Sequence, residues 1–194
     1  MHHPNPEELK KLLGVIDRQA PFGERDFAWI ILALHTGLRV GELVSLNVGQ
    51  VVNIDGQPRK AFVVPGTIAK YNKNRLIPLN ETARKAVATL VAFNRKRGFS
   101  VEPTAPLLVN RKHQRISARA ARYALEKYCK KADLDVSISP HSLRHGFACA
   151  LIGKSSTRVT QAALGHVKLT STAKYTHVMP GELQSGLSSL GRRG

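Results

Sequence analysis

The sequence is poor in cysteine, in acidic residues and in long apolar runs. Its 194 residues include two cysteines, Cys129 and Cys149, and no Cys-x-x-Cys pair. This spacing argues against a disulfide framework and against a thiolate metal site. No apolar run reaches the length of a membrane span, and the opening Met1-His2-His3-Pro4 is not a signal peptide. We therefore expect a protein of the reducing cytoplasm that does not enter a membrane.

The shortage of acid leaves a large excess of positive charge. Thirty Lys and Arg residues stand against 13 Asp and Glu residues, for a net charge of +17 and a pI of about 10.5. Such an excess opposes a compact fold unless a polyanion is the partner, and each neutralised DNA phosphate releases counterions. Ribosomal-type binding and membrane-surface binding are the alternatives. Because the basic residues are spread along the chain, we expect a folded, positively lined groove that binds nucleic acid, in a nucleoid-associated protein.

The pattern of apolar residues predicts one domain, mainly α-helical with a small three-stranded antiparallel β-sheet (α+β). The composition, 42% apolar and 22% charged, is that of a globular domain. Helices are expected at 6–16 with Asn5 as cap, at 27–34 with Gly37 as stop, at 38–46, 80–96, 117–132, from 139 onward, and around 158–164, 171–177 and 182–190. Strands are expected at 51–54, 61–64 and 76–79.

Two stretches in the first half carry candidate phosphate-binding groups. In Thr36-Gly37-Leu38-Arg39-Val40-Gly41-Glu42-Leu43, Arg39 follows a glycine break near a helix start. Its planar guanidinium suits two phosphate oxygens, although a surface pair with Glu42 is the plainer interpretation. In Lys70-Tyr71-Asn72-Lys73-Asn74-Arg75, a lysine at a hairpin tip can give a proton to a leaving alkoxide. The alternative there is solvated turn charge.

Two further stretches lie in the last third. In His141-Ser142-Leu143-Arg144-His145, positions 141, 144 and 145 share one helix face, where imidazole moves protons and arginine holds phosphate. A solvated basic face is the alternative. Zinc bound by His141 and His145 is disfavoured, since no acidic residue follows the first histidine and no third ligand has a set spacing.

Tyr175 is the candidate nucleophile. It lies in a short polar segment, nine residues after His166 of Leu164-Gly165-His166, and is followed by Thr176-His177. Tyr123 and Tyr128 are placed mid-helix without a nearby histidine, which favours a packing role for both.

The order and spacing of these four stretches resemble the tyrosine recombinase family, which includes phage integrases, chromosome-dimer-resolving recombinases and conjugative-element integrases. The matching boxes are Thr-Gly-Leu-Arg-x-x-Glu-Leu at 36–43, the hairpin lysine at Lys70, His-x-Leu-Arg-His at 141–145, Leu-Gly-His at 164–166 and Tyr-Thr-His at 175–177. The resemblance covers nearly the whole chain. It departs from the family at Tyr71, where a glycine is common, so Lys73 is an alternative to Lys70.

The resemblance implies a site-specific recombinase or integrase that uses neither metal nor ATP. Tyr175 would attack the scissile phosphate to give a 3′-phosphotyrosine, Lys70 would protonate the leaving 5′-oxygen, and His141 would exchange a proton near the tyrosine. Arg39, Arg144 and His166 would hold the non-bridging oxygens, with Glu42 and His145 orienting the set. The residues expected to contact DNA are Lys70, Lys73, Arg75, Arg39 and Arg144.

The resemblance also implies an assembly. Residues 1–194 would form one catalytic domain without the family's N-terminal DNA-binding domain, and 182–194 would exchange between protomers. The partner would be double-stranded DNA, bound by a homotetramer in the synapse and by a monomer when the domain is isolated. A type IB topoisomerase-like enzyme and a catalytically silent DNA-binding module are the two rivals. Product topology, relaxed plasmid against recombinant junctions, separates the topoisomerase from the recombinase.

Overall fold

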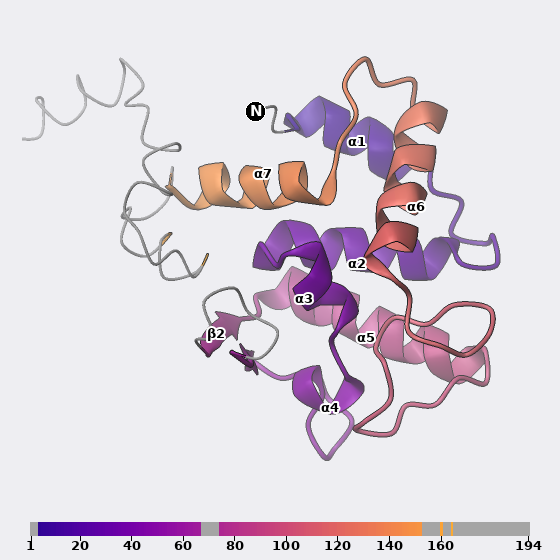
Figure 1. The fold of residues 1–194 in the computed structure, drawn as a ribbon, viewed down its shortest axis with the longest axis vertical. Helices are drawn as coiled ribbons and strands as arrows, with labels where there is room; N and C mark the ends of the chain where they lie inside the picture. The colour runs from indigo at the N-terminus through magenta and orange to yellow at the C-terminus, as the bar shows by residue number, and fades with distance from the viewer. Residues whose placement is uncertain (1–3, 67–73, 153–159, 161–163, 165–194) are drawn as a thin grey trace, which may run out of the picture.

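Helix α2 (Gly23–Thr36) forms the centre of the fold in the computed structural model, which describes residues 4–66, 74–152, 160 and 164. Trp29, Ile30 and Leu32 of this helix are fully buried. Figure 1 shows α2 lying between α7 (Pro140–Ile152) and α5 (Glu81–Lys96), and both of these helices pack on it. Because it is covered on both sides, α2 is apolar over much of its surface, as its sequence indicated.

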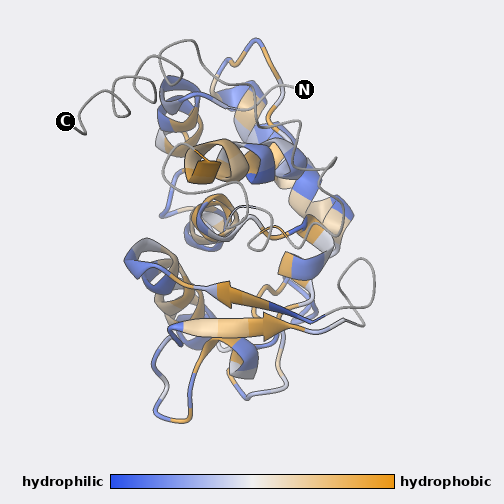
Figure 2. Cartoon of the chain, turned by 90° about the vertical axis from the view of Figure 1, so that its left-hand side faces the viewer, coloured by the Kyte–Doolittle hydropathy of each residue, from blue (hydrophilic) through white to orange (hydrophobic). Residues whose placement is uncertain are grey.

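The remaining described elements surround this three-helix centre. They are α1 (Pro6–Gly14), α3 (Val40–Val44), α4 (Val48–Val51), β1 (Ala61–Val64), β2 (Arg75–Pro78) and α6 (Ala118–Lys131). Figure 2 shows the two strands side by side, with apolar residues along both. Helix α1 packs on α6, and α3 also contacts α6. No helix in the described part of the chain is long and apolar enough to cross a membrane.

The helix starts follow the predicted capping signals. The Asn5 side chain accepts a hydrogen bond from the Glu8 amide at 2.9 Å, and the Glu8 carboxylate accepts one from the Asn5 amide at 2.7 Å. The Asn80 and Ser117 side chains cap α5 and α6 by accepting hydrogen bonds from the Ala83 and Ala120 amides. These side chains satisfy amides that have no partner within the helix. The predicted helices at 80–96 and 117–132 are thus confirmed.

The predicted strand at 51–54 is wrong, and the described sheet has two strands rather than three. Gln50 accepts a hydrogen bond from the Asn47 amide at 2.7 Å, and the short helix α4 runs from there through Val51. Val52 makes only an isolated bridge to Pro58, and Ile54 is fully exposed. A short apolar run is ambiguous between buried helix and buried strand, and here a local helical cap decided the outcome.

The two strands pair antiparallel in a register that fixes the position of Arg75. Ala61 lies opposite Pro78, and Val64 lies opposite Arg75. Arg75 is therefore the first residue of β2, and its partner Val64 is the last residue of β1. The predicted helices at 171–177 and 182–190 lie outside the described residues, as does most of the one predicted at 158–164.

Candidate active site

The turn after α2 places Arg39 at the beginning of another helix. Gly37 ends α2 with φ +60°, a left-handed conformation that favours glycine, and its amide bonds back to the Ala33 carbonyl. The chain then turns, so that Arg39 is the N-cap of α3. Its side chain is 29% exposed, so it is only partly covered by the protein. The glycine break predicted from the sequence is confirmed and orients this arginine.

Glu42 is a buried carboxylate at the centre of a cluster of arginines. Its Oε1 lies 2.8 Å from Arg39 Nη1, and its Oε2 accepts a bond from the Arg39 amide at 2.8 Å. The same Oε2 lies 2.8 Å from Arg75 Nη2 and 4.0 Å from Arg144 Nη1. Since Glu42 is 1% exposed, the surface-pair interpretation of Arg39 and Glu42 does not hold.

Arg144 enters the cluster from the far end of the sequence. It lies on α7 with 3% exposure, and its guanidinium donates to the Gly37 carbonyl and, at 2.6 Å, to the Leu164 carbonyl. Arg39 and Arg144 are 105 positions apart in the sequence, yet both reach Glu42. The packing of α7 on α2 is what brings them together.

The two histidines of the same box have different environments. His141 is exposed at the start of α7, whereas His145 is partly buried, with its Nδ1 3.5 Å from the Cys149 sulfur one turn further on. Burial raises the pKa of the Cys149 thiol, which keeps it in the neutral form at physiological pH. Within the described residues, no group of three or more His, Cys, Asp or Glu side chains is arranged to hold a metal ion.

Arg75 lies inside the protein rather than on its surface. It is 8% exposed, and its guanidinium bonds to Glu42 and, at 2.5 Å, to the Leu164 carbonyl. Burial lowers its pKa, and the Glu42 carboxylate opposes this effect. Contact with DNA, predicted from the sequence, would require Arg75 to give up these internal bonds.

The remaining predicted site residues, Lys70, Lys73, His166 and Tyr175, lie outside the described residues. Two backbone carbonyls, of Gly37 and Leu164, accept hydrogen bonds from the arginines and were not predicted from the sequence. Each belongs to a motif that the sequence had singled out, but a carbonyl leaves no signal in a residue pattern.

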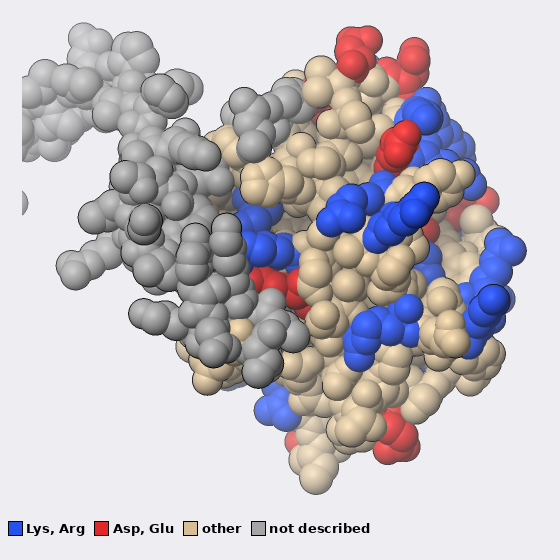
Figure 3. Space-filling view, in the orientation of Figure 1, with Lys and Arg blue, Asp and Glu red and all other residues tan. Residues whose placement is uncertain are grey.

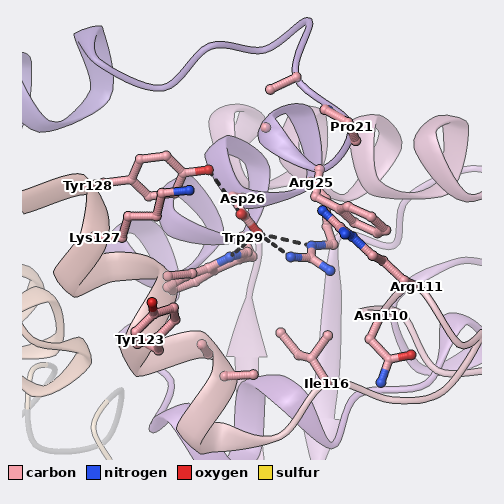
Figure 4. A pocket seen from close by; sticks show the side chains of 16 residues that line it. Pro21, Arg25, Asp26, Trp29, Asn110, Arg111, Ile116, Tyr123, Lys127 and Tyr128 are labelled. Carbon is pink, nitrogen blue, oxygen red and sulfur yellow. Dashed lines mark hydrogen bonds and ion pairs between the residues drawn. The ribbon is translucent and has the colours of Figure 1, made fainter. Parts of the chain in front are cut away.

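A second polar centre lies apart from this cluster, in a cavity of about 360 Å³ between α2 and α6 (Figure 4). Asp26 accepts bonds there from Arg25 at 2.7 Å, from Trp29 Nε1 at 3.1 Å and from the Tyr128 hydroxyl at 3.0 Å. Burial and the Asp26 charge raise the pKa of Tyr128, which makes it a poor nucleophile. The predicted packing role of Tyr128 is confirmed, while Tyr123 is 69% exposed.

Basic side chains form several patches on the face that carries α3 and α6. Figure 3 shows lysine and arginine over this face, and acidic and basic atoms meet in the region beside the grey segment. The arrangement places the partly exposed Arg39 and the buried Arg144 around one carboxylate, a pairing of guanidinium groups that suits a phosphodiester.

Comparison with known proteins places this geometry in a family. The profile described as "Phage integrase family" matches residues 5–182. The chain belongs to the phage integrase family. The tyrosine recombinase XerC of Pelotomaculum thermopropionicum is 36% identical over 177 residues, which is 89% of this chain and 56% of the relative. The tyrosine recombinase XerD of Ralstonia nicotianae is 33% identical, over 88% of this chain and 54% of the relative. This family member thus spans about half the length of the curated relatives it matches.

Solved structures of recombinases share the fold of this integrase-family chain. The Tn1549 transposon integrase in complex with transposon right end DNA has a TM-score of 0.79 at 19% identity, covering 97% of this chain and 66% of the other. The XerH site-specific recombinase bound to difH substrate, a pre-cleavage complex, has a TM-score of 0.75 at 25% identity, covering 97% and 54%. The fold is therefore mainly helical with a small antiparallel sheet, similar to tyrosine recombinase catalytic domains.

Proposed function

We propose that this chain is the catalytic domain of a site-specific DNA recombinase that cleaves and rejoins DNA through a 3′-phosphotyrosyl intermediate. The observation that carries the proposal is the convergence of Arg39 and Arg144 on one buried carboxylate, Glu42. In a member of the phage integrase family, this pair is suited to hold the non-bridging oxygens of a scissile phosphate.

In the proposed mechanism the Tyr175 hydroxyl loses its proton to His141, and its oxygen attacks the phosphorus. A bond forms between the tyrosine oxygen and phosphorus while the bond from phosphorus to the 5′-oxygen breaks. Lys70 gives its proton to that leaving oxygen, so the products are a phosphotyrosine and a free 5′-hydroxyl. The phosphotyrosine conserves the bond energy. A 5′-hydroxyl from a second strand reverses the steps and completes the exchange without metal or ATP.

The cationic groups stabilise the charge that builds up on the phosphate. Arg39 and Arg144 bind the non-bridging oxygens, His166 adds a hydrogen bond, and Glu42 and His145 orient the set. In other enzymes, removal of one such preorganised donor reduces the rate by roughly 10²–10³-fold. We further propose that residues 1–194 act as one domain on double-stranded DNA, as a monomer alone and as a tetramer in the synapse. Residues 182–194 would then exchange between protomers.

The test is covalent trapping on a suicide duplex. The crossover site is first identified by sequencing genomic DNA fragments that stay attached to the protein after denaturation. A duplex with this site carries a nick just past the scissile phosphate, so that the short leaving fragment diffuses away. We expect a protein–DNA adduct on a denaturing gel with EDTA present.

Tyr175→Phe is the decisive control, because it removes one hydroxyl and leaves the ring. The adduct should disappear in this variant, whereas Tyr128→Phe should still form it. No adduct from the unmodified chain, alone or joined to an N-terminal DNA-binding domain, would contradict the proposal and leave a basic DNA-binding module.

A further inference from the structure

Arg75 is an internal cation whose partners all belong to the candidate active site. Its Nη2 lies 2.8 Å from Glu42 Oε2, and its Nη1 donates to the Leu164 carbonyl at 2.5 Å. An arginine that is 8% exposed is rare unless it is paired, and here the pairing is to the carboxylate that also binds Arg39. The position of Arg75 at the beginning of β2 therefore joins the sheet to the arginine cluster.

Both acceptors of Arg75 also lie close to Arg144, which binds the Gly37 carbonyl in addition. Arg144 Nη1 is 4.0 Å from the Glu42 oxygen that Arg75 binds at 2.8 Å, and Arg144 Nη2 donates to the same Leu164 carbonyl at 2.6 Å. The carboxylate is thus paired closely with Arg39 and Arg75, and only at a distance with Arg144. In a buried site, where charges are weakly screened, this difference in distance decides how far the carboxylate offsets the positive potential of each guanidinium.

We propose that Arg75 is a positioning residue for phosphate binding. It neutralises Glu42 at Oε2 and so prevents Arg144 from closing onto the carboxylate. Arg144 then stays on the Gly37 and Leu164 carbonyls, with its positive charge directed to the scissile phosphate. Three guanidiniums around one carboxylate leave a net charge of +2 for the substrate. This inference rests on the proposed function, and it assigns to Arg75 an indirect role instead of a contact with DNA.

The same bonds link Arg75 to the two stretches on either side of the cluster. Leu164 lies two residues before His166 in the sequence, and Arg75 lies five residues after Lys70. A carbonyl that accepts two guanidinium bonds is held firmly, since charge-assisted hydrogen bonds are the strong ones. Without Arg75, we expect Arg144 to move toward Glu42 and the Leu164 carbonyl to lose one of its two donors.

The experiment compares Arg75→Met, Arg75→Lys and Arg59→Met on two suicide duplexes. One duplex carries the ordinary scissile phosphodiester. The other carries a methylphosphonate, in which an uncharged methyl replaces one non-bridging oxygen and reduces the need for cationic stabilisation. Arg59 is the matched control, because it is an exposed arginine before β1 that bonds to the Val52 carbonyl. Dissociation constants and cleavage rates at saturating protein are measured for each variant.

We expect Arg75→Met to bind DNA within threefold of the unmodified chain and to cleave the phosphodiester about 100-fold more slowly. Cleavage of the methylphosphonate by Arg75→Met should slow far less, so that the ratio of the two cleavage rates changes by about tenfold or more. The cleavage rate of Arg75→Lys should lie between those of Arg75→Met and the unmodified chain. Lysine keeps a positive charge beside Glu42 but lacks the planar guanidinium that also reaches the Leu164 carbonyl. Arg59→Met should leave both rates and their ratio unchanged.

A purely structural role gives a different result. If Arg75 only holds the fold, both substrates lose the same factor in step with a lower melting temperature, and the proposal is overturned. Unchanged cleavage by Arg75→Met also overturns it. Should Arg75→Met fail to fold, the rate ratio of Arg75→Lys decides in the same way. Absence of any adduct from the unmodified chain would instead contradict the proposed function, and the role of Arg75 would fall with it.

Discussion

At the scale of single residues, charge balance around Glu42 decides the geometry of the site. A carboxylate that is 1% exposed is costly to bury, and its close pairs with Arg39 and Arg75 compensate for the lost hydration. The arginines in turn depend on Glu42, since this carboxylate forms the ion pairs with both Arg39 and Arg75. Stability and the proposed phosphate binding are therefore linked through one side chain.

We predict that Glu42→Gln destabilises the fold and slows cleavage. The amide keeps the shape of the side chain but leaves the positive charges of Arg39 and Arg75 uncompensated. Breaking one partner of a buried ion pair costs about 3–5 kcal/mol, which for a chain of this size lowers the melting temperature by roughly 6–20 °C. Thermal unfolding monitored by circular dichroism measures the change.

Glu81→Gln is the matched control for this prediction. Glu81 lies in the first turn of α5, 70% exposed, with loose pairs to Arg84 and Lys85 at 3.8 and 3.5 Å. Surface pairs of this kind contribute little, so its melting temperature should stay within about 2 °C of the unmodified chain. Equal effects of the two substitutions would refute the central role of Glu42.

At the scale of elements, the site depends on how α2 ends. Gly37 has φ +60°, and a Cβ added there would lie 2.3 Å from the Phe147 ring of α7. The same residue offers its carbonyl to Arg144. The absence of a side chain at Gly37 thus permits the left-handed turn, the close approach of α7 and the bond that holds Arg144.

We predict that Gly37→Ala is more harmful than Gly98→Ala. Gly98 also has a positive φ, +70°, but a Cβ there would meet nothing within 4 Å. Gly98→Ala should therefore cost only the backbone strain, about 1–2 kcal/mol. Gly37→Ala adds the collision with Phe147, for a total of roughly 3 kcal/mol or more, and should reduce cleavage as Arg144 shifts. Urea unfolding and suicide-substrate rates compare the two, and equal losses would show that the contact with α7 relaxes freely.

At the scale of the whole molecule, the net charge of +17 governs association. On the proposed function, electrostatic steering and counterion release would both act over the basic patches seen in Figure 3, without reference to DNA sequence. The charge would then supply affinity for any duplex, and the cluster around Glu42 the chemistry at one phosphate.

We predict steeply salt-dependent DNA binding by the chain. If it neutralises six or more phosphates, a plot of log K against log salt concentration should have a slope of about −5 or steeper. Fluorescence anisotropy with a labelled duplex between 50 and 200 mM KCl measures it. Arg39→Gln should reduce the slope by about one unit, whereas Arg75→Met should leave it unchanged if Arg75 does not touch DNA. A slope near zero would contradict a phosphate-based interface.

The residue pattern was sufficient to identify the family and the helices at 80–96 and 117–132, whereas the helix expected at 27–34 begins earlier, at Gly23. Caps such as Asn5 and Asn80 act within a few residues, and a left-handed stop such as Gly37 is local as well, so these features are readable from short stretches. The strand predicted at 51–54 was wrong, because the helix cap at Asn47 outweighed the β-like residues that follow it.

The three arginines that surround the Glu42 carboxylate could be recognised only from the packing of the folded chain. Arg75 was expected to contact DNA, and Glu42 was interpreted as half of a surface pair with Arg39. The packing of α7 on α2 and the register of β2 instead bury both residues and bring Arg144 to the same carboxylate. Burial and distance between remote segments set the strength of an ion pair, and neither quantity is contained in residue spacing along the chain.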